Sequence, residues 1–305
     1  MSLPSFILLG AAKAGTTVLW EHLKAHPDIF MCPVKEPNFF AMEGKRAAFA
    51  GPGDDAAINR HCVTDLDSYS QLYSEAGKAQ ACGEASNLYL YSPDAPATVR
   101  HYVPDAKLLV VLRNPADRAY SSFLHLRRDE REPFTRFRDA LAHEAERVSA
   151  NWEHLWHYRR MGLYSEQLTR YFDLFDRAQM HIYLYEDLLE SPGDVLRSIF
   201  TLLEVDPAHE PDLSLRTSAT GLPRNRWVHR VLWPLIDQPS ILKSLAKRLT
   251  SERVRRMISY KVKVKNIRKP EFPPDVRREL TAYFREDVLR LQTMIGRDLS
   301  AWLAP

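Results

Sequence analysis

The stretch "FILLGAAKAGTTVLWEHL", residues 6–23, decides the fold. It starts with an apolar run, Phe6–Leu9, that is short enough for a strand buried on both faces. Two glycines five residues apart follow, with a lysine between them and a Thr-Thr pair after them. From Gly15 to Ala25 the apolar pattern predicts a helix, which Pro27 stops. This strand–loop–helix order predicts an anion site, because backbone N–H groups at a helix start attract negative charge.

The loop Gly10–Thr17 nearly fits the nucleotide-binding pattern G-x-x-x-x-G-K-[ST], but Thr16 replaces the expected lysine and the loop's lysine is Lys13. A kinase of this type also needs an acid at the end of a neighbouring strand to hold Mg²⁺. The best neighbouring strand, "KLLVVL" at residues 107–112, is instead followed by Arg113. An arginine there binds an anion and repels a metal. The loop therefore predicts phosphate binding without an obvious metal site, and a Mg²⁺-dependent ATP kinase is the alternative enzyme.

A second phosphate clamp is predicted in "RNPADRAYSSF", where Arg113 ends the strand, Pro115 fixes a turn and Ser121 lies one to two turns into a helix. Arginine pairs with phosphate through two parallel hydrogen bonds, which makes the contact strong and directional. Two separate basic clamps indicate a ligand with phosphate groups at both ends.

Along the chain, short apolar runs alternate with helical patterns, which predicts an α/β, P-loop-like three-layer fold with a central, mainly parallel sheet flanked by helices. The predicted strands are Ser5–Leu9, Ile29–Met31, Cys82–Glu84, Lys107–Leu112 and Met180–Leu184. Besides Gly15–Ala25, the predicted helices are Asp187–Leu203 and one that starts near Pro274 and that Gly296 closes. The Gly-, Ala- and Asp-rich region Gly44–Asp67 is interpreted as a mobile loop.

Charge is distributed unevenly along the chain. Residues 224–269 hold 14 of the 42 Lys and Arg residues but 2 of the 39 Asp and Glu residues, so the remainder has a net charge of −9 although the whole chain has +3. We expect one domain over residues 1–305 with a basic helical insertion or lid at about 224–269. Such a patch faces an anion, a membrane surface or solvent, and the sequence leaves these three open.

The three cysteines, Cys32, Cys62 and Cys82, are scattered and odd in number, which is typical of a reducing compartment. No apolar run approaches the roughly 18 residues of a membrane span, and the N-terminus lacks the features of a secretory signal. These observations predict a cytoplasmic protein without a membrane span. His154 and His157 lie three residues apart but have no third ligand nearby, so they do not predict a metal site.

Five segments in this order resemble the sulfotransferases that use 3′-phosphoadenosine 5′-phosphosulfate (PAPS), in the branch that includes heparan sulfate sulfotransferases and bacterial members. The segments are "LLGAAKAGTTVLWEHLKAHPDI" (8–29), "KEPNFF" (35–40), "GEASNLY" (83–89), "KLLVVLRNPADRAYSSF" (107–123) and "YEDLLESP" (185–192). Each motif alone is modest evidence for this family, whereas five motifs in the right order are specific for it.

For the donor, the resemblance implies that Lys13 contacts the bridging oxygen of the phosphosulfate without any metal. The loop after it is implied to cradle the 5′-phosphate, and Arg113 with Ser121 to hold the 3′-phosphate. A late basic loop of the family is matched by "SATGLPRNR", which contains Arg224 and Arg226. The residues implied to bind PAPS, or its product adenosine 3′,5′-bisphosphate (PAP), are Lys13, Ala14, Gly15, Thr16, Thr17, Arg113, Ser121 and Arg224.

For the acceptor, the resemblance implies that Glu36 is the general base and that a hydroxyl, or less readily an amine, of a small metabolite or carbohydrate is sulfated. Glu84 and a histidine are alternative bases; Glu84 is as easily structural, and His125 is interpreted as a surface residue. The heparan sulfate enzymes carry a lysine where this chain has Ala85, so their acceptor is not transferred. No nucleic-acid partner is expected. The alternative from another class is a non-catalytic protein that binds anions or a membrane surface.

Overall fold

The computed structural model describes residues 3–212, 221–225 and 266–304. Its centre is a sheet of five parallel strands in the order β2-β3-β1-β4-β5. The strands are β1 (Phe6–Gly10), β2 (Ile29–Met31), β3 (Ala81–Ala85), β4 (Lys107–Leu112) and β5 (Met180–Leu184). A separate antiparallel pair joins β6 (Leu222–Pro223) to β7 (Ile267–Arg268).

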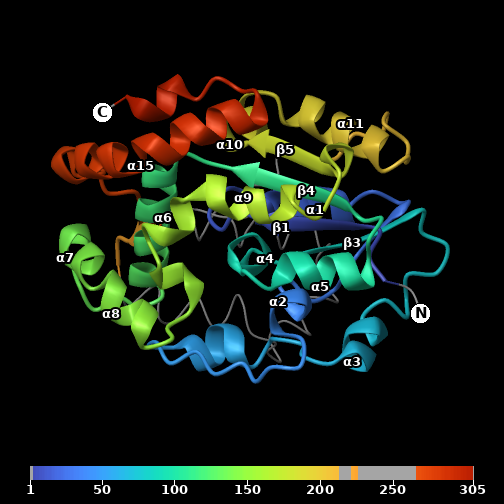
Figure 1. Ribbon diagram of the computed structural model, residues 1–305, viewed down its shortest axis with the longest axis horizontal. Coiled ribbons are helices and arrows are strands. Elements are labelled where there is room, and N and C mark those ends of the chain that lie inside the picture. The colour runs from blue at the N-terminus through green and yellow to red at the C-terminus, as the bar shows by residue number, and fades with distance from the viewer. Residues whose placement is uncertain (1–2, 213–220, 226–265, 305) are drawn as a thin grey trace.

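Helices flank this sheet. The described helices of eight or more residues are α1 (Thr16–Lys24), α5 (Ala95–Tyr102), α6 (Pro115–Arg128), α9 (Tyr164–Phe172), α11 (Pro192–Leu202) and α15 (Pro274–Ile295). Shorter ones are α2 (Phe39–Met42), α3 (Leu66–Gln71), α4 (Leu88–Tyr91), α7 (Phe137–Ala142), α8 (Glu144–Ser149) and α10 (Tyr185–Glu190). Single helical turns of other geometry are η1 (Asp55–Asn59), η2 (His154–Trp156), η3 (Arg160–Gly162), η4 (Arg177–Gln179) and η5 (Ser300–Leu303). In Figure 1 the strands cross the middle of the molecule from β5 down to β3, with α15 and α11 beyond β5 and α2 and α3 at the opposite end.

The two central strands, β1 and β4, are apolar and buried along almost their whole length, as expected of parallel strands covered on both faces. Gly83 on β3 lets the ring of Phe6 pack against the backbone, since a Cβ at this position would lie 2.1 Å from that ring. Because neighbouring strands are parallel, their carboxyl ends meet at one edge of the sheet, where ligands bind in open α/β sheets. The loops that follow β1 and β4 therefore lie side by side.

Most elements predicted from the sequence are confirmed. The five strands occur where expected, with boundaries that differ by at most one residue at either end. The first helix begins at Thr16, and the last begins at Pro274 and ends where Gly296 adopts a left-handed conformation, with φ 65°. The predicted fold class, an α/β fold with a central parallel sheet, is confirmed.

The prediction of one helix over Asp187–Leu203 is wrong. The structure has two helices, α10 and α11, which are separated at Ser191. Ser191 has φ −137° and ψ 58°, outside the helical region. Its neighbour Pro192 has no N–H to donate and disfavours helical geometry in the residue before it. The apolar periodicity continues across the break, which is why the pattern alone hides it.

The region interpreted as a mobile loop, Gly44–Asp67, follows a defined path. It contains the helical turn η1, and the Asp54 carboxylate just before η1 accepts the backbone N–H groups of Gly51 (2.7 Å) and Glu153 (2.8 Å). The predicted basic insertion at 224–269 falls mostly on residues 226–265, outside the described part of the chain. Among the described helices, none is both long and apolar enough to cross a membrane.

Candidate active site

The loop after β1 is shaped by two residues with positive φ, Lys13 (68°) and Gly15 (92°). At Gly15 a side chain would also be crowded, because a Cβ would lie 3.3 Å from the ring of Tyr185. The helix α1 starts directly afterwards, so the loop and the positive end of the helix dipole face the same space. Ala14 differs from its neighbours, since its side chain is fully buried and its N–H donates to the Ala11 carbonyl (3.2 Å).

Lys13 carries the main positive charge of this loop. The pKa of its ammonium group is lowered from 10.5 to about 7, mainly by burial and then by the nearby cations Arg128, Arg113 and Lys35, whereas Asp129 acts in the opposite direction. Among the described residues, Lys13 forms no ion pair. A lysine buried in this way favours an anionic ligand, because bound negative charge raises the pKa of Lys13 and so restores its protonated form.

Arg113, at the end of β4, connects the ends of β1 and β4, although the sequence predicted two separate clamps. Its Nη1 donates to the Lys13 carbonyl (2.9 Å), and its guanidinium lies 4.6 Å from the ring centroid of Tyr185, within the range of a cation–π contact. The Arg113 carbonyl accepts the hydroxyl of Tyr164 (3.0 Å). The two predicted clamps are therefore one structural unit.

The helix α6 brings Ser121 to the same place. Its first turn is capped by the Asn114 side chain, whose Oδ1 accepts the N–H groups of Ala116 (3.0 Å) and Asp117 (3.3 Å). Ser121 is buried two turns later. Together with Arg113 it lines both a large cavity and a second cavity of about 580 Å³.

The second cavity brings basic residues from the C-terminal part of the chain next to Arg113. The Tyr120 hydroxyl donates to the Glu271 carbonyl (2.9 Å), and its ring stacks on Phe272 with centroids 4.5 Å apart. These contacts hold Lys269 against α6, in the wall of the cavity. Arg277 and Arg278 line the same cavity, and Arg277 pairs with Asp117 (2.9 Å).

The large cavity has a volume of about 910 Å³, near the upper end of the range of roughly 300–1,000 Å³ that ligand sites occupy. It has room for two small molecules. We divide its lining residues into two groups. The loop after β1, Arg113 and Tyr185 contact one another and form the first group. Glu36, His154 and residues of the segment 53–61 form the second. We call the space beside them the donor half and the acceptor half, after the roles that we propose for them.

Glu36 lies in the acceptor half, where three donors fix its carboxylate. They are the Asn87 backbone N–H (3.1 Å), the Asn87 side-chain amide (2.5 Å) and the Lys35 ammonium (3.0 Å). Burial by itself raises the pKa of Glu36, but the charge of Lys35 and these hydrogen bonds outweigh it, so the pKa is lowered. Glu36 is therefore ionised at neutral pH and able to accept a proton from a bound group.

Glu84, the alternative base, does not line either cavity. It is fully buried in β3 and accepts hydrogen bonds from the hydroxyls of Tyr69 (2.5 Å), Ser86 (2.9 Å) and Tyr89 (2.9 Å). Burial raises its pKa to about 7. This environment favours the structural interpretation of Glu84.

Among the histidines that line the large cavity, His125 and His154 lie near the predicted site residues. His125, which the sequence suggested to be a surface residue, faces the cavity with its side chain 24% exposed. Its Nδ1 lies 2.7 Å from Arg128 and its Nε2 lies 3.5 Å from Asp129. Burial, followed by the charge of Lys13, lowers the pKa of His125 well below its ordinary value. His154 lies in the acceptor half, close enough to Glu36 for the two to influence each other's pKa.

Arg224 does not join the residues gathered here. It is exposed, it lines neither cavity, and its backbone N–H donates to the Asn266 carbonyl (2.6 Å) beside the β6–β7 pair. Its predicted partner Arg226 lies outside the described residues. The basic residue that lines the second cavity together with Arg113 is Lys269, which was not predicted from the sequence.

Sequence reasoning also missed Tyr185, Asn87 and the segment 53–61 as cavity residues. Tyr185 begins "YEDLLESP", and Asn87 lies in "GEASNLY", so both occur in segments that carry the resemblance to the PAPS-dependent sulfotransferases. The segment 53–61 carries no motif, and only the tertiary structure brings it to the site.

Comparisons with known proteins agree with this geometry. A family model described as "Sulfotransferase family" matches residues 4–210. A solved sulfotransferase from Alicyclobacillus acidocaldarius is 36% identical, with a TM-score of 0.79 and complete coverage of both chains.

Curated relatives are more distant. Bifunctional heparan sulfate N-deacetylase/N-sulfotransferase 3 from Mus musculus is 24% identical over 99% of this chain and 31% of its own length. Carbohydrate sulfotransferase 15 from Homo sapiens is 24% identical over 76% of this chain and 49% of its own length. Heparan sulfate glucosamine 3-O-sulfotransferase 3B1 from Mus musculus is 28% identical over 65% of this chain and 45% of its own length. The chain thus spans between a third and a half of the length of these relatives.

Proposed function

The chain belongs to the sulfotransferase family, and on that premise we propose that it transfers the sulfuryl group of PAPS to a hydroxyl of a small or carbohydrate acceptor. The observation that carries the proposal is the convergence of Lys13, Arg113 and Glu36 on one cavity of about 910 Å³. The two cations suit an anionic donor, and the carboxylate suits a hydroxyl that must lose its proton.

The donor half fits a nucleotide with phosphate groups at both ends. Lys13 and the start of α1 suit the 5′-phosphosulfate, because they combine a full charge with a helix N-terminus. Arg113 and Ser121 suit the 3′-phosphate, and Lys269 lines the cavity next to them. Arginine at the end of β4 favours a phosphate over Mg²⁺, so PAPS is a better match than ATP with a metal.

The proposed reaction is an in-line displacement at sulfur. The acceptor oxygen forms a bond to sulfur, the bond from sulfur to the 5′-phosphate oxygen breaks, and the acceptor proton passes to Glu36. Lys13 stabilises the charge that develops on the leaving phosphate oxygen, an interaction that strengthens towards the transition state. Proton removal by Glu36 contributes about 10²–10⁴-fold to the rate.

A carbohydrate acceptor is supported by the names of the curated relatives, which act on carbohydrates or heparan sulfate. The alanine at position 85, where the heparan sulfate enzymes carry a lysine, argues against carrying heparan sulfate itself over to this chain. For the compartment we propose the cytoplasm, because Cys32, Cys62 and Cys82 are all free thiols, as expected in a reducing environment.

The test is transfer of radiolabelled sulfate from PAPS to a panel of hydroxyl acceptors, with the wild-type chain and Lys13→Ala. We expect turnover to fall by about 10²–10³-fold in Lys13→Ala, because a donor aimed at developing charge is removed. PAP binding should weaken far less. Lys24→Ala, an exposed lysine at the other end of α1, serves as the matched control and should keep wild-type turnover. Wild-type turnover in Lys13→Ala would rule out the assigned role.

A further inference from the structure

His154 is a buried side chain without a partner. Its residue is 4% exposed, it lines the acceptor half of the cavity, and among the described residues neither ring nitrogen forms a hydrogen bond. Nδ1 is shielded from solvent, so Nε2 is the nitrogen that can reach a ligand. The neighbouring His157 differs, because its Nδ1 pairs with the Tyr91 hydroxyl (2.8 Å) and it lines neither cavity. Buried polar groups normally have partners, so a cavity-lining imidazole that has none among the described residues suits a hydrogen bond to a bound ligand.

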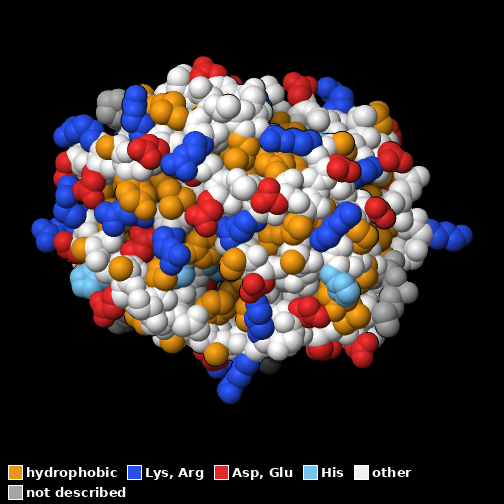
Figure 2. Space-filling model, viewed as in Figure 1, with side chains coloured by type: hydrophobic (Ala, Val, Ile, Leu, Met, Phe, Trp, Pro, Cys, Tyr) orange, Lys and Arg blue, Asp and Glu red, His pale blue; other side chains and the backbone are white. Residues whose placement is uncertain are grey.

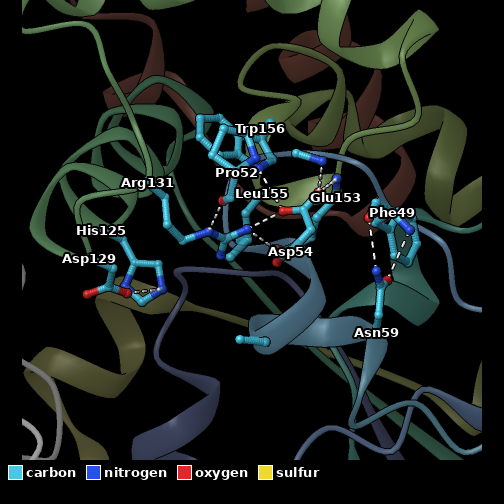
Figure 3. A network of polar contacts seen from close by, with 12 residues as sticks. Phe49, Pro52, Asp54, Asn59, His125, Asp129, Arg131, Glu153, Leu155 and Trp156 are labelled. Atoms are coloured by element: carbon cyan, nitrogen blue, oxygen red, sulfur yellow. Dashed lines mark hydrogen bonds and ion pairs between the residues drawn. The ribbon is translucent and has the colours of Figure 1, made fainter.

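The turn η2 that carries His154 is held on both sides. Next to it, the Glu153 N–H and the Trp156 indole N–H donate to the Asp54 carboxylate, at 2.8 Å and 3.0 Å. The Leu155 carbonyl accepts the hydroxyl of Ser122 (2.8 Å). Figure 3 shows Asp54 meeting Arg131, Glu153 and Trp156. The ring is therefore presented to the cavity by a rigid support.

The His154 ring is neutral at physiological pH. Burial lowers its pKa to about 4, and the nearby negative charge of Glu36 offsets this only in part. A neutral imidazole donates one hydrogen bond and accepts another, which suits a hydroxyl group. When the proton is on Nε2, the N–H group faces the cavity, where it can donate a hydrogen bond to an oxygen of the acceptor substrate. An anionic group would instead favour a cation at this position.

The cations in the wall of the acceptor half already have partners. Lys35 pairs with Glu36 (3.0 Å), and Arg131 pairs with Glu153 (2.6 Å) and with Asp54. Asp129, which also lines the cavity, is likewise paired, with Arg128 (2.8 Å). Within the described part of the chain, this half therefore offers no spare positive charge, in contrast to Lys13 in the donor half.

We propose that His154 binds the acceptor through Nε2–H, and that the acceptor is an uncharged sugar or polyol with a second hydroxyl beside the reacting one. The reacting hydroxyl gives its proton to Glu36 as its oxygen bonds to sulfur, while His154 donates to the neighbouring oxygen and keeps its own proton. This inference rests on the proposed sulfotransferase function and assigns an acceptor class to it.

The experiment compares matched sugars with radiolabelled PAPS: the methyl glycosides of glucose, galactose and mannose against the corresponding uronic acids. We expect measurable transfer to at least one neutral glycoside and a lower kcat/KM for its uronic acid. In His154→Leu, kcat/KM for that glycoside should fall by about tenfold, mainly through KM, because a hydrogen bond to the acceptor is lost. His154→Gln, whose amide N–H takes the place of Nε2–H, should recover most of it.

Two controls distinguish an effect of the substitution on folding from an effect on acceptor binding. The affinity for PAP and the melting temperature should be the same in wild type and His154→Gln, and His157→Gln should retain the wild-type KM for the glycoside. Three outcomes would overturn this inference alone. They are a preference for uronic acids, wild-type kinetics in His154→Leu, and no transfer to any of these sugars by a protein that binds PAP. Failure of the wild-type chain to bind PAP would overturn the proposed function together with it.

Discussion

Lys13 has two properties that a surface lysine lacks. Its backbone has a φ of 68°, and its pKa is lowered to about 7 by burial and by the surrounding cations. Near neutral pH its ammonium group is therefore only partly protonated before a ligand binds. Bound phosphate favours the charged form, so the pKa of Lys13 rises in the complex. Donor binding and proton uptake are coupled at this residue.

The coupling predicts a pH dependence of PAP binding. Below pH 7 Lys13 is charged in both states, and affinity should change little on its account. Above pH 7 the complex holds more protons than the free protein, so affinity should fall, by a total no greater than the modest loss of PAP affinity expected in Lys13→Ala. Isothermal titration from pH 6 to 9 measures this. Lys13→Arg, which stays charged, should flatten the profile, and an unchanged slope in that variant would contradict the assignment.

Glu36 and Glu84 differ in what surrounds them, which predicts different effects of the same substitution. Glu36→Gln removes the proton acceptor from the cavity and should lower kcat by about 10²-fold or more while PAP binding persists. Glu84→Gln leaves the cavity unchanged and should retain kcat, with any loss appearing as lower thermal stability. Single-turnover assays and melting curves separate the two. Loss of kcat in Glu84→Gln with normal stability would make Glu84 the base.

At the scale of elements, the buried carboxylate of Asp54 is one anchor of the segment 44–67, in addition to backbone contacts such as the Ala50 N–H to the Asn151 carbonyl (3.0 Å). Asp54 accepts a hydrogen bond from the Gly51 N–H. It also accepts hydrogen bonds from Glu153 and Trp156 and pairs with Arg131, as Figure 3 shows. This network joins η1, the end of α6 and η2, which together form the acceptor half of the cavity.

We expect Asp54→Ala to lower the free energy of unfolding by about 3–5 kcal/mol, because it leaves the Arg131 cation and several N–H groups without their buried partner. Urea denaturation measures the loss. Asp55→Ala is the matched control: its exposed carboxylate pairs only with the exposed Arg60, and stability should hardly change. Equal stability of both variants would show that the network does not hold the segment.

The sequence predicts the elements whose local signals are strong. Apolar runs gave all five strands, and Gly296 marked the end of α15. The break at Ser191 was missed because the apolar stripe continues across it. At the site, Lys13, Arg113, Ser121 and Glu36 were found because each follows a motif. Tyr185, Lys269 and the segment 53–61 were not, because only packing brings them there.

At the scale of the whole molecule, the site combines parts that are distant in the chain. The ends of β1 and β4 supply the donor half, and Lys269 reaches the adjoining cavity from beyond the long basic stretch. Figure 2 shows charges of both signs mixed over the visible face, rather than one basic surface. Within the described part of the chain, Lys13 is a buried cation without an ion pair and lies inside the donor half, which suits a small anionic ligand.

The central claim is that this cavity binds a 3′-phosphorylated nucleotide in preference to ATP with Mg²⁺. The most direct measurement is isothermal titration of the full chain with PAP and, separately, with ATP and Mg²⁺. The account predicts that PAP binds tighter by about two orders of magnitude, because Arg113 and Ser121 hold its 3′-phosphate. ATP with Mg²⁺ binding as tightly as PAP, or tighter, would contradict the account and favour a kinase.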